Sequence, residues 1–169
     1  MARTKLFFCW LLYAFAALSF LLLQSVVLNR LSFVSTFHPF LLPLLVGLTA
    51  IYTPRLGSAT FAFLFGFLCD MLFVGPIPCF YLLAFTLCAV CAGLLSHRFI
   101  APGFLCSLLI GGLSLLLTNL LQIFFLSFQT EVPFLTCLTI LFVDMFLSMP
   151  FLLLLHPIYS RINRLLTRI

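Results

Sequence analysis

The sequence predicts an all-α integral membrane protein: a six-transmembrane-helix bundle with both termini cytoplasmic. Three observations predict this fold class, namely the composition, the lengths of the apolar runs and the distribution of basic residues between them. Of the 169 residues, 65% are hydrophobic and 7% are charged, and the mean hydropathy is +1.36. A soluble domain needs a charged exterior, so a chain this apolar is expected to have lipid as its solvent.

The apolar runs set the number of spans. A bilayer core of about 30 Å takes about 20 apolar residues per helix, so the chain has room for five or six spans. No hydrophilic stretch is longer than a loop, which leaves no room for a soluble catalytic domain. The six expected helices are Leu6–Leu28, Pro39–Thr53, Ala59–Val74, Cys79–Leu95, Phe104–Phe128 and Pro133–Leu155.

The first two helices differ in length. The first follows a short basic start, and its apolar run is longer than that of a signal peptide, which predicts an uncleaved anchor. The second follows a polar connector, Asn29–His38, and Pro39 suits the first position of a helix. It is short and has Pro43 in its first turns. If only five helices cross the membrane, this short helix is the one expected to re-enter.

Four short connections separate the remaining helices. Thr53–Ser58 and Ser96–Gly103 read as a basic turn and a basic loop, whereas Gly75–Pro78 is an uncharged turn and Gln129–Val132 an acidic one. Cytoplasmic loops carry an excess of Lys and Arg, so these connections predict the topology.

With the N-terminus in the cytoplasm, seven basic residues fall inside and only Arg30 falls outside. This bias favours six spans with both ends cytoplasmic. Glu131 lies outside, where the rule is indifferent to acids. The residues on the inner side are Arg3, Lys5, Arg55, Arg98, Arg161, Arg164 and Arg168.

The chain is therefore divided into a transmembrane domain, residues 1–155, and a basic amphipathic cytoplasmic tail, residues 156–169. In the tail, Ile158, Ile162, Leu165 and Ile169 recur at intervals of three and four residues. The other face holds the basic residues. This pattern predicts an interfacial helix on the inner leaflet, bound to anionic lipid; the alternative is docking to a cytoplasmic partner. The basic residues of this membrane surface are Arg161, Arg164 and Arg168.

Two acidic residues lie inside apolar runs, where a carboxylate costs roughly 2.5 to 3.5 kcal/mol on insertion scales. Asp70 lies near the end of the third helix. It is either functional, as a proton relay, ion site or partner contact, or structural, as a cap on a neighbouring helix end. Asp144 lies near the middle of the sixth helix. Its structural interpretation is a hydrogen bond to a facing helix, for example to Asn119.

No residue pattern supports an enzyme. The acids do not form a catalytic pair, and the sequence has neither a phosphate-binding glycine loop nor a nucleophile elbow. His38, His97 and His156 are too widely separated to predict a metal site. Cys88 and Cys91 lie within a helical apolar run and read as packing residues. We therefore expect no cofactor, no metal and no nucleic-acid partner.

The order of several motifs resembles a known family. The first helix ends in Leu21–Gln24, and His38–Pro39 opens the second. Gly66-x-x-x-Asp70 is followed by Gly75 and Pro76. Together they are similar to the bacterial rod-shape-determining protein MreD family. Pro78 and Cys79 depart from the family pattern, which usually has a glycine there.

The resemblance implies a non-enzymatic inner-membrane scaffold of the cell-elongation complex, which regulates cell shape and peptidoglycan synthesis through MreC. MreB, RodA and a class B penicillin-binding transpeptidase would be indirect partners. Gly66, Asp70 and Gly75 match the family block, and with Pro76 and Asp144 they are the expected partner-binding or structural residues.

By analogy the implied fold is similar to the substrate-binding subunits of energy-coupling-factor transporters. The alternative function is such a vitamin-binding subunit. That reading needs an A-x-x-x-A stripe on the first helix, which Ala14, Ala16 and Ala17 do not form.

Overall fold

The computed structural model describes residues 2–25, 40–73, 75–98, 103–129 and 134–168, and within these ranges it is all-helical, with six helices and no strand. The fold class is therefore helical, as expected. The helices are α1 (Ala2–Leu23), α2 (Leu42–Tyr52), α3 (Arg55–Leu72), α4 (Phe80–Arg98), α5 (Phe104–Gln129) and α6 (Phe134–Arg168).

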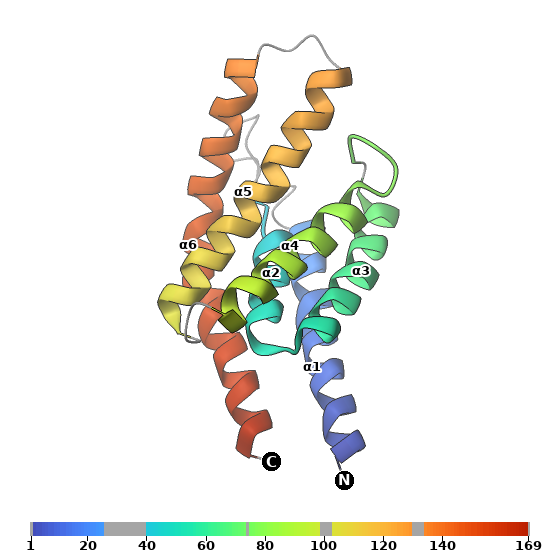
Figure 1. The fold of residues 1–169 in the computed structure, drawn as a ribbon, viewed down its shortest axis with the longest axis vertical. Helices are drawn as coiled ribbons and strands as arrows, with labels where there is room; N and C mark the ends of the chain where they lie inside the picture. Colours follow the sequence, from blue (N-terminus) through green and yellow to red (C-terminus); the bar gives the residue numbers. More distant parts are fainter. Residues whose placement is uncertain (1, 26–39, 74, 99–102, 130–133, 169) are drawn as a thin grey trace.

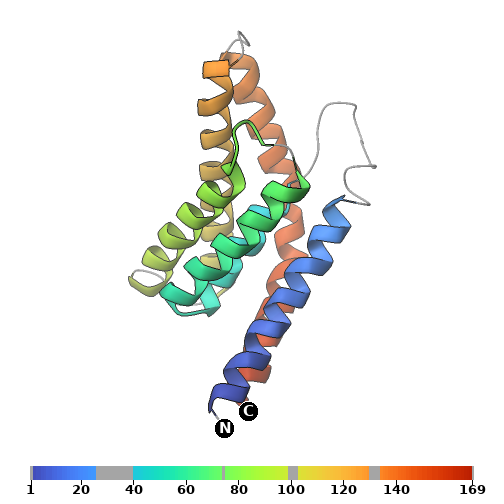
Figure 2. The same cartoon turned by 90° about the vertical axis from the view of Figure 1, so that its right-hand side faces the viewer.

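Successive helices alternate in direction (Figure 1). The first turn of α1 and the last turn of α6 lie at the same end of the molecule in both views (Figures 1 and 2). The start of α3, the end of α4 and the start of α5 lie toward that end as well. We call it the basic end, because the helix termini gathered there carry the Lys and Arg residues of the sequence pattern.

The short helix α2 lies at the centre of the bundle. Every residue from Leu42 to Ile51 is buried, and α2 packs against α3, α4, α5 and α6. Its 11 residues span about 16 Å, roughly half of a bilayer core, so α2 is too short to cross a membrane alone. Pro43 lies in its first turn, where a missing N–H costs no helical hydrogen bond.

Side chains of two distant helices accept hydrogen bonds from the two residues just before α2, and we call this pair of bonds the cap on α2. Leu41 N–H donates to Gln24 Oε1 at 3.2 Å, and Phe40 N–H donates to Ser148 Oγ at 3.0 Å. Gln24 and Ser148 are themselves buried, in the last turn of the α1 segment and in α6. These acceptors replace the water that a buried helix start lacks, because a buried unpaired N–H is costly.

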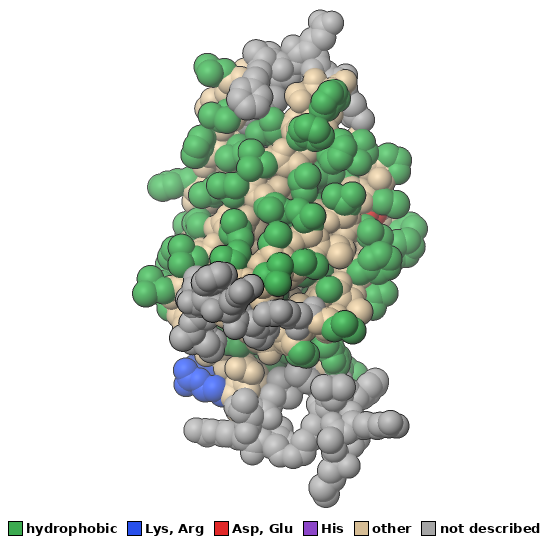
Figure 3. Space-filling view, viewed as in Figure 1, with side chains coloured by type: hydrophobic (Ala, Val, Ile, Leu, Met, Phe, Trp, Pro, Cys, Tyr) green, Lys and Arg blue, Asp and Glu red, His purple; other side chains and the backbone are tan. Residues whose placement is uncertain are grey.

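The exterior is apolar. Large hydrophobic side chains are exposed on α1 and on α3 to α6, among them Phe15, Leu64, Leu105 and Phe146. Figure 3 shows such side chains over most of the visible face, with Lys and Arg side chains near the lower edge. By length and composition, two helices of the described chain are able to cross a membrane: α5 over Phe104–Phe128 and α6 over Leu141–Arg164.

The expected turn at Thr53–Ser58 is shorter than predicted. Pro54 is the cap residue, α3 begins at Arg55, and Ser58 N–H already donates to Pro54 O at 2.9 Å. Gly57 is helical rather than part of a turn. A Cβ there would lie 2.6 Å from the Trp10 ring, so this glycine lets α1 pack closely on α3.

The expected end of the sixth helix at Leu155 is also wrong. Helix α6 continues through Pro150 and Pro157 to Arg168, so the tail is not a separate element. Tyr159 and Ile162 are buried, and the Tyr159 ring stacks on Tyr13 of α1 with centroids 5.6 Å apart. These contacts extend the bundle past Pro157 and place Tyr159 of α6 beside α1.

Two smaller boundaries also differ. Helix α4 extends to Arg98, into the expected basic loop Ser96–Gly103. Helix α3 ends at Leu72 rather than at Val74, where Phe73 turns to an extended backbone. His38, Pro39, Arg30 and Glu131 lie outside the described residues, and so does the expected end of the first helix at Leu28.

The cap on α2 predicts a stability effect at Gln24. Gln24→Leu removes the acceptor of the buried Leu41 N–H and should lower the free energy of unfolding by about 1–3 kcal/mol. Titration of the detergent-solubilised protein with SDS, followed by circular dichroism, measures this loss. Ser19→Ala is the control, because that exposed hydroxyl bonds only to Phe15 O of its own helix. Equal stability of the two variants would show that Gln24 does not cap α2.

Candidate functional site

The candidate site is the corner where α3 turns into α4, because it holds Asp70. The carboxylate reaches across to the start of α4: Tyr81 N–H donates to Asp70 Oδ1 and Leu82 N–H donates to Oδ2, each at 2.9 Å. Both oxygens therefore accept a hydrogen bond from first-turn N–H groups that have no partner within their own helix. A negative charge at this position also interacts favourably with the α4 dipole. Asp70 thus caps α4, which is the structural interpretation.

Gly66 makes this reach possible. It lies one turn before Asp70 on the face of α3 that meets α4. A Cβ at residue 66 would lie 2.6 Å from Leu82 Cα and 2.7 Å from Tyr81 O, which is closer than atoms can approach. The two backbones therefore touch at Gly66, and the short Asp70 side chain spans the remaining gap. The spacing Gly66-x-x-x-Asp70 therefore places two successive turns of α3 against the start of α4.

The turn between the two helices is built from few hydrogen bonds. Phe73 N–H donates to Cys69 O at 2.8 Å and closes α3, and Phe80 N–H donates to Ile77 O at 3.2 Å before α4 begins. Cys79 has a φ of +60°, the one non-glycine residue with positive φ in the described chain. This conformation favours glycine, because a Cβ is strained in it. The departure from the family pattern at Cys79 therefore falls on a residue whose backbone suits glycine.

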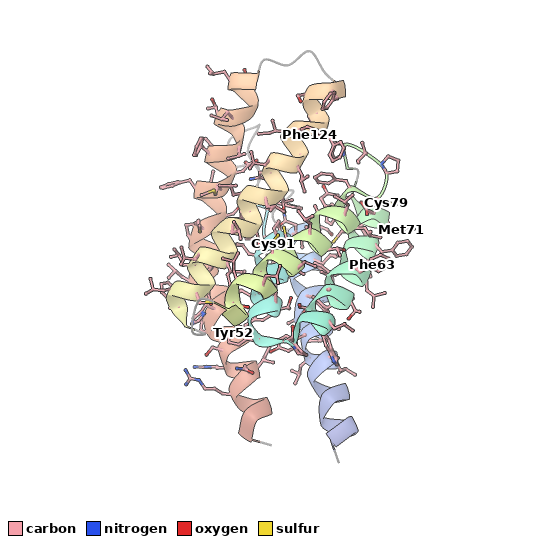
Figure 4. The ribbon with its side chains drawn as sticks, viewed as in Figure 1. Tyr52, Phe63, Met71, Cys79, Cys91 and Phe124 are labelled. Atoms are coloured by element: carbon pink, nitrogen blue, oxygen red, sulfur yellow. The ribbon has the colours of Figure 1, made fainter. Side chains whose placement is uncertain are left out.

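Gly75 and Pro76 shape the same turn. Both are partly buried, and a Cβ on Gly75 would lie 3.0 Å from Phe80 Cβ. With the end of α3 they border a shallow hollow of about 370 Å³, lined by residues 70–73 and 75–79, in which Asp70 is the one charged residue. Figure 4 shows Cys79 at the turn and Met71 on the outer side of α3. The corner thus presents a capped carboxylate beneath an uncharged, partly exposed loop.

Aromatic rings hold the start of α4 in place. Tyr81 contacts the rings of Phe40, Phe73, Phe80 and Phe85, with centroids 5.3–6.3 Å apart. Phe40 precedes α2, whose start is capped by Gln24 and Ser148. The Asp70 cap and the α2 cap are therefore joined through packed rings.

Asp144 is partly buried on α6, away from this corner in the sequence. Asn119 and Asp144 each lie ten residues from the α5–α6 connection, so they are at a similar height in the hairpin. The expected hydrogen bond from Asn119 is not formed, because the buried Asn119 Nδ2 has no hydrogen-bond partner. The example chosen from the sequence was therefore wrong, although Asp144 does interact with another group.

The remaining predicted residues lie at the basic end. Arg161 and Arg164 are exposed on the last turns of α6, which also contain Arg168. The structure does not bring them near the Asp70 corner. Among the described residues, no three His, Cys, Asp or Glu side chains gather as metal ligands would. Cys88 Sγ instead lies 3.4 Å from Thr118 Oγ1, in a packed contact between α4 and α5.

A scan against protein-family models finds no match, and searches of the curated proteins and of the solved structures find no significant match.

Sequence reasoning missed two acceptors and the identity of the groups that donate to Asp70. Gln24 was noted only as the end of a motif, Ser148 was not singled out, and the acceptor role of Asp70 toward Tyr81 and Leu82 was not assigned to particular donors. A polar side chain deep in an apolar run was the available signal for Gln24 and Ser148. The donors are backbone groups, which no residue type reveals.

The Asp70 cap predicts a graded loss of stability. Asp70→Ala leaves two first-turn N–H groups of α4 without an acceptor and should lower the free energy of unfolding by about 2–4 kcal/mol. Asp70→Asn keeps one oxygen acceptor and should lose about half as much. The same SDS titration measures both variants. Full stability of Asp70→Ala would contradict the cap.

The backbone of Cys79 predicts a second ordering. Cys79→Gly should be more stable than Cys79→Val by about 2 kcal/mol, because a β-branched residue is poorly tolerated at positive φ. Cys79→Ala, which removes the thiol but keeps the Cβ, should match the original chain. Thermal unfolding followed by intrinsic fluorescence compares the three. If the glycine and valine variants melt together, the turn does not have this conformation.

Proposed function

We propose that the chain is a non-enzymatic, multi-pass scaffold of the bacterial inner membrane, which acts in the cell-elongation complex through MreC. The proposal combines the motif resemblance with the geometry of the α3–α4 corner. In this role the protein positions partners for cell-wall synthesis, and MreB, RodA and a class B penicillin-binding transpeptidase are reached indirectly.

One observation carries the proposal. The two residues that are most specific to the resemblance, Gly66 and Asp70, interlock two helices. A carboxylate whose two oxygens accept hydrogen bonds from backbone N–H groups fixes the position of one helix on another, as a scaffold requires. A transporter subunit would instead use such a residue to meet its ligand. Two hollows elsewhere, between α1 and α3 and between α4 and α5, are lined almost wholly by apolar side chains.

The membrane arrangement in this proposal places the basic end in the cytoplasm. The alternating helix directions and the gathering of the termini at one end support it (Figures 1 and 2). The apolar exterior supports insertion, since side chains such as Leu64 and Leu105 have no aqueous role. In this arrangement α2 is the one of the six described helices that spans only part of the membrane, enclosed by its neighbours.

The surface proposed to meet MreC is the α3–α4 turn. Pro78 and Cys79 are exposed there, and Asp70 fixes the start of α4 beneath them. The turn lies opposite the basic end, on the side that the topology assigns to the exterior. An uncharged, exposed turn whose following helix is held by Asp70 suits contact with a membrane-anchored partner.

Recovery of MreC tests the surface. A tagged chain is purified from its native membrane in mild detergent, and the recovered proteins are identified by mass spectrometry. Asp70→Ala should reduce MreC recovery at least threefold. Pro78→Arg, which leaves the cap intact, should do the same. Leu56→Arg, equally bulky and charged but at the opposite end of α3, should not.

The opposite results are equally clear. Unchanged MreC recovery by well-folded Pro78→Arg would place the contact elsewhere. Recovery of a transporter ATPase and its coupling subunit in place of MreC would reject the scaffold and favour the vitamin-transport alternative.

A further inference from the structure

A polar cluster lies at the basic end, where the end of α2, the start of α5 and the last turns of α6 converge. Ser107 Oγ of α5 lies 2.8 Å from His156 Nδ1 of α6, and Ser107 is fully buried. Tyr52, labelled in Figure 4, ends α2 and faces Ser107 and Ser160. This cluster has no role in the α3–α4 corner.

One ring nitrogen of the histidine is held by Ser107. Ser107 Oγ also lies 3.2 Å from Gly103 O and is hydrogen-bonded to Tyr52, so the direction of the bond to His156 Nδ1 depends on the tautomer of the imidazole. The second ring nitrogen, Nε2, has no hydrogen-bond partner among the described residues. The imidazole is therefore held by one nitrogen and presents the other, which donates to a ligand in the Nε2–H tautomer.

Basic side chains lie near the cluster. Arg164 interacts electrostatically with the Tyr52 hydroxyl, and Arg161 is exposed one turn earlier on α6. The described segments at this end, residues 52–58, 96–98, 103–107 and 156–168, contain no Asp or Glu. A ligand that complements the cluster is therefore an anion.

Apolar side chains border the cluster. Phe104, Leu105, Leu108 and Ile158 are each at least 39% exposed on α5 and α6. The Phe104 ring meets His156 edge to face, with centroids 5.4 Å apart. An anion with hydrocarbon chains would place its charge on the cluster and its chains along these residues. Inorganic phosphate shares the charge but makes no use of this border.

We propose that His156, Arg164 and Tyr52 form a binding site for the phosphodiester headgroup of an anionic phospholipid, whose acyl chains lie against Phe104, Leu105 and Ile158. The site is independent of the scaffold role and of MreC. It replaces a general attraction of the basic tail to the membrane with one bound lipid between α5 and α6.

Native mass spectrometry of the purified full chain tests the site, with phosphatidylglycerol and phosphatidylcholine as the added lipids. The chain should retain phosphatidylglycerol in preference. His156→Ala and Arg164→Gln should each weaken retention about fivefold, the equivalent of about 1 kcal/mol per basic group. Arg161→Gln is the matched control, because it removes the same charge from the same helix outside the cluster, and it should retain the lipid.

Each other outcome overturns the proposal. Equal losses in Arg161→Gln and Arg164→Gln would mean a diffuse surface charge. Equal retention of the two lipids would mean no headgroup recognition. Displacement of phosphatidylglycerol by inorganic phosphate at matched concentration would mean a site for the free anion, without a role for the apolar border. Arg164→Gln keeps the test valid if His156→Ala unfolds, since Arg164 is exposed.

Discussion

The constraint on which this structure depends is that a helix beginning inside an apolar bundle needs acceptors for its first N–H groups. Water does not supply them there, and the chain supplies them from other helices. Asp70 accepts for α4, and Gln24 and Ser148 accept for α2. Three of the polar side chains inside the bundle thus accept from backbone N–H groups in the first turn of α4 or just before α2.

This constraint explains why close contact and charge occur together. A carboxylate on the short side chain of Asp70 reaches α4 only because the glycine one turn earlier brings the backbones into contact. The rings around Tyr81 then fill the space that the close approach leaves at the edge of the corner. The helix pair is therefore specified by glycine, carboxylate and aromatic residues together, each of which would be misplaced without the others.

Much of the helical arrangement could be predicted from apolar run lengths, because burial and lipid both select for them. The helix ends were less predictable. Gly57 is typical of a turn, but it lies in α3, where its missing side chain makes room for Trp10. Pro157 is typical of a helix end, but α6 continues past it and Tyr159 stacks on Tyr13. Asp70 could be singled out as a residue that needed a partner. The donors that Asp70 binds depend on how α3 and α4 cross, which the sequence does not show. Asn119 and Asp144 lie at a similar height in the α5–α6 hairpin, and yet Asn119 Nδ2 has no hydrogen-bond partner.

The cap on α2 has a consequence for how the protein is made. Phe40 and Ser148 are 108 residues apart in the chain, so the ribosome has produced five helices before this hydrogen bond can form. Until then Phe40 N–H lacks its acceptor and α2 lacks its packing contacts with α6. During synthesis α2 therefore stays incompletely enclosed until α6 has been made, and a chain that ends before α6 lacks this hydrogen bond.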